Sequence, residues 1–204
     1  KSTPELHYPS FKIIMKELRP DAREYDLAEF TRKCYDPGFE RFCTEELGFT
    51  DEEMDREYEI WKNYIKDKTP DFYDGFIDMV KRFKAAGGYL CVVSLSERDE
   101  IERHYRENGV ELDLVYGWEL PNEQRKPSPY PMKQILEKLE LAPADCLMVD
   151  DLRLGYDMAH ACGVDFAAAG WSHGLLPEVA EFMRAHSEHY FATVKELADF
   201  VFAD

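Results

Sequence analysis

The chain has 204 residues, with 25 Lys and Arg against 42 Asp and Glu, and a formal net charge of −17 at pH 7. A nucleic-acid binder needs a basic surface to neutralise phosphates, and docking to anionic membranes needs one too. Apolar residues make up 45% of the sequence, enough for a core, and no apolar run approaches the ~18 residues of a membrane span. We therefore expect neither a nucleic-acid partner nor a membrane partner.

The cysteines indicate the same kind of protein. The five of them are odd in number and show no CxxC spacing. Cys91, Cys146 and Cys162 lie in apolar stretches, which favours buried free thiols in a reducing cytoplasm. We expect a cytoplasmic protein.

The first third of the chain predicts helices and no strand. Apolar residues at helical spacing indicate a first helix over residues 11–18, which Pro20 ends. Short helices follow, and Thr50-Asp51-Glu52-Glu53 has the form of a capping box that begins a longer helix. We expect residues 1–10 to be the start of a core domain or a linker, and residues 11–68 to form a helical cap.

Beyond Thr69-Pro70 the pattern alternates between strands and helices. Apolar strands are predicted at residues 89–95, 112–116, 146–149 and 164–169 and near Tyr190, with helices between them. Continuous apolar strands that alternate with helices are typical of a parallel sheet covered on both faces. The sequence predicts an α/β fold, a doubly wound, Rossmann-like parallel sheet over residues 69–204, with a small all-helical cap domain.

Polar residues stand where ligands bind in such sheets, at the carboxyl ends of strands. Ser94 ends one strand, and its hydroxyl with the following backbone N–H of Leu95 can hold a phosphate oxygen, although a turn serine is the alternative. Ser96-Glu97-Arg98-Asp99 has the form of a capping box, so we expect Ser96 to be an N-cap.

Asp150 and Asp151 are the strongest local signal. Two adjacent carboxylates repel, which raises one pKa, and a hard divalent cation relieves the repulsion. Magnesium prefers one or two carboxylates together with water and substrate oxygens. A solvated loop with an N-cap is the alternative.

Lys126 and the histidines complete the set of candidates. Lys126 stands before Pro127-Ser128-Pro129, where prolines restrict the backbone, so its ammonium can be held against a phosphate and a nearby carboxylate. Without the strand signals it would be an ordinary surface lysine. The histidines form no HxxxH pattern, and His186 and His189 are interpreted as surface residues.

These motifs in this order resemble the haloacid dehalogenase-like hydrolase superfamily, in particular its phosphoglycolate phosphatase and β-phosphoglucomutase type with a helical cap. Val92-Val93-Ser94 resembles the second motif, which binds phosphate, and Lys126-Pro127-Ser128-Pro129 resembles the third, whose lysine stabilises the phosphoryl intermediate. Residues 149–155 resemble the fourth, which binds magnesium. Many members have Gly-Asp at the acidic pair and a further Asp where Gly155 stands, so the metal role is carried to Asp150 and Asp151 only.

The family's first motif, a strand that ends in Asp-x-Asp-x-Thr with the nucleophilic aspartate first, occurs nowhere in the sequence. Ser2-Thr3-Pro4 resembles residues a few positions beyond it, so we expect the nucleophile upstream of Lys1. The alternative is a pseudoenzyme that begins at Lys1 and binds phosphate without catalysis.

The resemblance implies a magnesium-dependent phosphatase that acts on a small phosphorylated metabolite through an aspartyl-phosphate intermediate. Ser94 and Lys126 would be catalytic, Ser94, Leu95 and Lys126 phosphate-binding, and Asp150 and Asp151 metal-binding. A phosphotransferase or phosphomutase shares every one of these residues. A signalling receiver domain has its acidic pair first in the chain, and a dehalogenase works without metal, so both are disfavoured. The substrate and the oligomeric state stay open.

Overall fold

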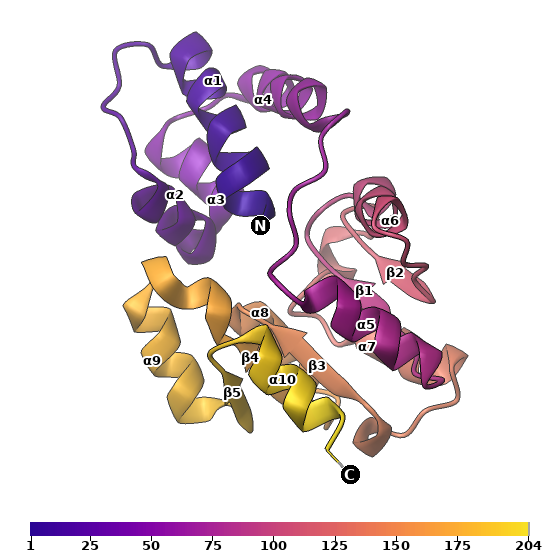
Figure 1. Cartoon of the computed structure of the whole chain (residues 1–204). Coiled ribbons are helices and arrows are strands. Elements are labelled where there is room, and N and C mark those ends of the chain that lie inside the picture. Colours follow the sequence, from indigo (N-terminus) through magenta and orange to yellow (C-terminus); the bar gives the residue numbers. More distant parts are fainter. Residues whose placement is uncertain (204) are drawn as a thin grey trace. The chain divides into compact units, whose positions relative to one another are not determined.

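The computed structural model describes residues 1–203, in which two compact units divide between Phe72 and Tyr73 (Figure 1). The expected division at residue 69 lies close to this point. Residues 3–10, within the segment expected as the start of a core domain or a linker, lie in the first two helices of the first unit. None of the described helices has the length and apolar character needed to cross a membrane.

The first unit is helical throughout. Its elements are η1 (Thr3–His7), α1 (Tyr8–Leu18), α2 (Leu27–Lys33), η2 (Cys34–Gly38), α3 (Phe39–Arg41), η3 (Phe42–Glu46) and α4 (Asp51–Ile65). The capping box at the start of α4 is confirmed, since Thr50 Oγ1 accepts the Glu53 N–H and Glu53 accepts the Thr50 N–H. Aromatic packing forms the core, with the Phe11 ring centroid 4.7 Å from Phe30 and 5.8 Å from Phe42.

One carboxyl group lies inside this apolar unit. Glu57 is on α4 and is 8% exposed, one turn before Ile60 and Trp61, which belong to the same core. Burial raises the pKa of Glu57 to about 7. The raised pKa keeps the carboxyl protonated in the folded state at pH values where it would be ionised in the unfolded chain.

The second unit contains the predicted strands and helices, each within a few residues of its expected bounds. Its elements are α5 (Phe76–Ala85), β1 (Cys91–Val93), α6 (Arg98–Glu107), β2 (Leu114–Tyr116), η4 (Asn122–Gln124), α7 (Tyr130–Lys138), η5 (Pro143–Asp145), β3 (Leu147–Asp150), α8 (Arg153–His160), β4 (Asp165–Ala169), η6 (Gly170–Leu175), α9 (Pro177–His186), β5 (His189–Phe191) and α10 (Val194–Val201). The α/β fold with parallel strands and a helical unit is confirmed.

The strands of this unit form two separate parallel sheets, β1-β2 and β3-β4-β5. Burial differs sharply among them. In β4, which has a strand on each side, every residue after Asp165 is buried, whereas all residues of β1 and β3 are only half-buried. Among the described residues, β1 and β3 each pair on one side only. Both therefore present an open edge of unpaired backbone groups.

The first strand of each sheet in chain order carries the open edge. The strand order is β1-β2 in one sheet and β3-β4-β5 in the other. Burial raises the pKa of Cys91 to about 11, and Cys146, just before β3, adds a smaller rise. Cys146 is thus close enough to Cys91 to affect its pKa. In open α/β sheets, ligands bind beyond the carboxyl ends of the strands.

The cysteines of the second unit are less buried than the sequence predicts. All five cysteines are free, but only Cys43 is buried, so Cys91, Cys146 and Cys162 are less buried than expected.

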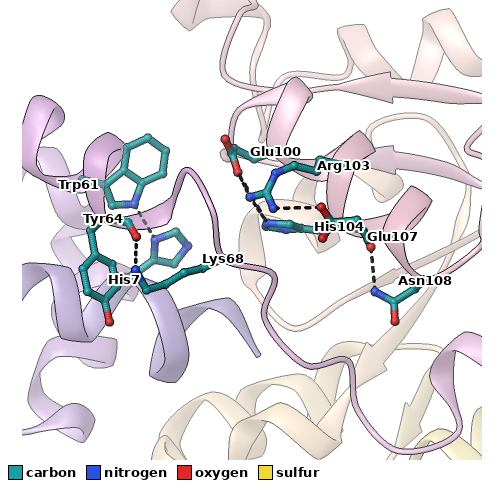
Figure 2. A network of polar contacts seen from close by, with 9 residues as sticks. All are labelled: His7, Trp61, Tyr64, Lys68, Glu100, Arg103, His104, Glu107 and Asn108. Carbon is teal, nitrogen blue, oxygen red and sulfur yellow. Dashed lines mark hydrogen bonds and ion pairs between the residues drawn. The ribbon is translucent and has the colours of Figure 1, made fainter.

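On α6, Arg103 pairs with Glu100 at 2.5 Å and with Glu107 at 3.5 Å (Figure 2). In the first unit the same figure shows the Trp61 indole donating to His7 Nδ1 at 3.1 Å.

We predict that Glu57→Gln stabilises the protein above pH 7. Because the folded state raises the pKa of Glu57, the folded protein holds a proton that the unfolded chain loses between about pH 4.5 and 7. The wild-type free energy of unfolding should fall by ~2 kcal/mol across that window. The neutral amide should remove this fall, as measured by urea unfolding at pH 5 and pH 8. Asp55→Asn, on the exposed side of α4, is the control; equal pH dependence in wild type and Glu57→Gln would contradict the prediction.

Candidate functional site

Ser94 lies directly after β1, and its backbone continues the ladder to β2 because its N–H donates to Tyr116 O at 2.9 Å. The Ser94 hydroxyl accepts the Ser96 N–H at 3.1 Å. In the described part of the chain, the Leu95 N–H donates to no protein acceptor. The strand end thus presents a hydroxyl and a backbone donor, the groups that bind phosphate oxygens.

The expected N-cap at Ser96 is wrong. Helix α6 begins at Arg98, its N-cap is Glu97, and no side chain caps it. Ser96 is held instead by its backbone, because its carbonyl accepts the Trp118 N–H at 2.9 Å and its N–H is used by Ser94. Ser96 therefore belongs to the turn after β1 and does not cap helix α6.

Lys126 and Asp150 form a buried ion pair. The Lys126 Nζ lies 2.5 Å from Asp150 Oδ2, and their side chains are 9% and 8% exposed. Lys126 comes from the loop before α7, whereas Asp150 is the last residue of β3. A buried pair is costly to break, because the remaining charge is left without a partner in a medium of low dielectric.

The adjacent carboxyls titrate in opposite directions. Burial by itself would raise the pKa of Asp150, but the charge and hydrogen bond of Lys126 outweigh it and hold that pKa below its ordinary value. Burial, and then the charge of Asp150, raise the pKa of Asp151 to about 7. One ammonium thus faces two carboxyls, of which the second keeps a proton near neutral pH.

The two carboxyl groups of Asp150 and Asp151 are chemically suited to bind a magnesium ion. Carboxylate oxygens are the donors that magnesium prefers, and one or two of them suffice when water and substrate oxygens fill the other positions. A divalent cation would also take the place of the proton that the crowded pair retains. Within residues 1–203, no three His, Cys, Asp or Glu side chains gather as a metal-ligand group, so the pair would have to act with other ligands.

The loop that carries both aspartates has a fixed shape. Asp150 Oδ1 accepts the Leu152 N–H at 3.0 Å, which turns the chain from β3 into α8. A Cβ on Gly155 would lie 2.5 Å from Asp150 Cβ and closer still to its carboxylate. The Asp150 side chain therefore occupies the space that a side chain at 155 would need, which explains why this chain combines an aspartate at 150 with glycine at 155.

Sequence reasoning missed His173, which hydrogen-bonds the backbone carbonyl of Asp151. His173, in η6 after β4, is 5% exposed, and its Nε2 lies 2.8 Å from Asp151 O. The neighbouring Ser172 hydroxyl donates to Ala169 O at 2.9 Å, which anchors the start of η6. Burial lowers the pKa of His173. Its position just beyond a strand's carboxyl end was the available signal, but only metal-type histidine spacing was considered.

The structure thus brings together Lys126, Asp150 and Asp151. No hydrogen bond or ion pair among the described residues joins Ser94 or Leu95 to these three. Ser94 follows β1 and the aspartates follow β3, so the open edges of the two sheets separate the two halves of the predicted site.

The family model of haloacid dehalogenase-like hydrolases matches residues 2–169. The chain therefore belongs to this hydrolase family. No curated protein matches the chain.

Solved structures share the fold at low identity. A protein described as a predicted phosphoglycolate phosphatase from Haemophilus somnus is 17% identical with a TM-score of 0.74, over 98% of this chain and 90% of that one. A haloacid dehalogenase-like family hydrolase of Streptococcus pneumoniae is 16% identical with a TM-score of 0.75, over 98% and 92%. CbbY of Rhodobacter sphaeroides, in complex with xylulose-1,5-bisphosphate, is 18% identical with a TM-score of 0.73, over 96% and 90%.

We predict that Gly155→Ala disrupts the acidic loop. The added methyl group overlaps the Asp150 side chain, and overpacking of this kind costs about 1–3 kcal/mol of unfolding free energy. Gly174→Ala is the matched control, because its Cβ would meet no atom within 4 Å. Chemical denaturation of the two variants measures the difference. Equal stability would mean that Asp150 can move aside freely.

Proposed function

We propose that the protein is a magnesium-dependent phosphatase that acts on a small phosphorylated metabolite through an aspartyl-phosphate intermediate. The observation that carries the proposal is the buried Lys126–Asp150 pair with Asp151 beside it, at the carboxyl end of β3 in a hydrolase of this family. Structural neighbours described as a phosphoglycolate phosphatase and as a complex with xylulose bisphosphate support phosphate esters as the substrate class.

In this proposal each residue has one role. Ser94 and the Leu95 N–H bind phosphate oxygens after β1, and Lys126 neutralises the charge that develops on the phosphoryl group. Asp150 and Asp151 hold magnesium, which when bound supplies positive charge to the phosphate and to the attacking carboxylate. The helical first unit acts as a cap that selects the substrate and excludes water.

The nucleophile needs a place in the fold. We propose that an aspartate on a strand upstream of Lys1 supplies it, and that this strand pairs with the open edges of β1 and β3. The half-buried state of both strands, beside the fully buried β4, supports a missing neighbour there. Its carboxylate would attack phosphorus as the ester P–O bond breaks and the leaving oxygen takes a proton. Water would then release inorganic phosphate and restore the carboxylate.

A phosphotransferase or phosphomutase uses the same residues and differs only in whether water or a sugar hydroxyl accepts the phosphoryl group. A chain that truly begins at Lys1 would bind phosphate without turnover. Intact mass and N-terminal sequencing of the protein from its native gene separate these cases, followed by phosphate release from a panel of phosphorylated metabolites with magnesium and with EDTA. Magnesium-dependent release supports a phosphatase; an upstream nucleophile without release on any substrate would overturn it.

We predict that Asp151→Asn abolishes the magnesium-dependent activity while the fold stays intact. The amide removes the charge that binds the metal but keeps the shape of the side chain. Steady-state phosphate release at increasing magnesium concentration measures the loss, and circular dichroism checks the fold. Wild-type turnover at high magnesium would refute the metal-binding role of Asp151.

We predict that Lys126→Ala lowers turnover ~10²-fold or more, the scale of losing one preorganised charge. Because the change also leaves Asp150 without its partner, a stability loss of about 3–5 kcal/mol is expected, and turnover should be measured well below the unfolding temperature. Lys133→Ala, which removes an exposed lysine of α7, is the control. A loss of less than about threefold would make Lys126 a purely structural residue.

A further inference from the structure

The carbonyl of Asp151 has an unusual partner. It lies in the turn between β3 and α8, before the helix can use its carbonyls, and it accepts from the buried side chain of His173. Only a protonated ring nitrogen can donate to a carbonyl, so the geometry requires the proton on Nε2. His173 is thus a donor aimed at the backbone of one of the two acidic residues.

His173 is held by a second contact on the opposite side of its ring. The Tyr190 hydroxyl, from β5, lies 3.4 Å from Nδ1, and the two rings are 5.8 Å apart. The Tyr190 ring in turn lies against Gly170, where a Cβ would be 2.5 Å from Tyr190 Cε1 and Cζ. Glycine at 170 leaves room for the ring, so the position of His173 is built from β4 and β5 together.

The segment that carries His173 is itself anchored. The Ser172 hydroxyl donates to Ala169 O at 2.9 Å, which ties the start of η6 to the end of β4. The Asp150 side chain is fixed separately, by Lys126 and Leu152.

We infer that His173 is a positioning residue, which together with Tyr190 fixes Asp151 in the orientation in which it binds a divalent cation. Part of this inference, the metal, rests on the proposed function. The holding of the loop does not, because it follows from contacts formed without any metal. Partners that orient metal ligands typically change metal affinity 10–100-fold when removed.

The test compares His173→Phe, which keeps a ring of similar size without the donor, with His173→Gln, whose amide nitrogen can reach the position of Nε2. In the metal-free full chain, hydrogen exchange of the Leu152 amide reports the shape of the loop, because this amide donates to Asp150. We expect exchange at least tenfold faster in His173→Phe and within threefold of wild type in His173→Gln. His186→Phe, at an exposed histidine that bonds only its own helix, is the control.

Binding of Mn²⁺, followed by electron paramagnetic resonance, is the second readout. We expect His173→Phe to weaken it by about tenfold or more and His173→Gln to restore it. A folded His173→Phe with wild-type exchange at Leu152 would overturn the inference. If His173→Phe does not fold, Tyr190→Phe decides: exchange at Leu152 threefold faster or more supports the inference, and unchanged exchange overturns it.

The outcomes also separate the inference from the proposed function. A wild-type protein that neither binds Mn²⁺ nor releases phosphate would overturn the proposed function, and the exchange of Leu152 would still decide the role of His173. Wild-type Mn²⁺ binding together with unchanged exchange and affinity in His173→Phe would overturn the inference and leave the proposed function standing.

Discussion

The buried ion pair between Lys126 and Asp150 is the constraint on which the candidate site depends. It joins the loop between η4 and α7 to the last residue of β3. Because neither charge can lose its partner cheaply in this interior, the pair fixes the position of both segments. Because Lys126 neutralises Asp150, Asp151 is the carboxyl that must keep a proton or bind a cation. The Lys126–Asp150 contact therefore determines the charge state of the whole acidic loop.

Around this pair the chain restricts the loop from every side. Glycine at 155, in α8, leaves room for the Asp150 side chain, and His173 of η6 donates to the Asp151 carbonyl. Asp150 is the last residue of β3, and His173 follows the carboxyl end of β4. The acidic loop is therefore rigid by packing and hydrogen bonds that exist before any ligand arrives, which is the condition that a preorganised charge needs in order to act on a reacting phosphate.

Much of this was accessible from the sequence, for physical reasons. Strand periodicity located β3 and β4, and the rule that ligands lie at strand ends selected Asp150 and Asp151. Lys126 was selected because Pro127 restricts the backbone beside it. Local patterns were less reliable where tertiary contacts compete. Ser96 matched a capping box, yet the turn at the end of β1 used its backbone instead. His173 was missed because its partner is a backbone carbonyl in the turn after β3, and no spacing of side chains in sequence reveals such a contact.

The open edges of β1 and β3 bear on how the molecule assembles. The two edges lie far apart in sequence, since Val93 ends one strand and Leu147 begins the other. The proposed bridging strand would make long-range parallel pairings on both sides, which form slowly because much chain must be ordered first. During that interval the two small sheets would be separate folding units, each with an unpaired edge strand that can pair with another chain. Sheet closure, rather than helix formation, would then set the rate of folding and the period in which the chain is most exposed to aggregation.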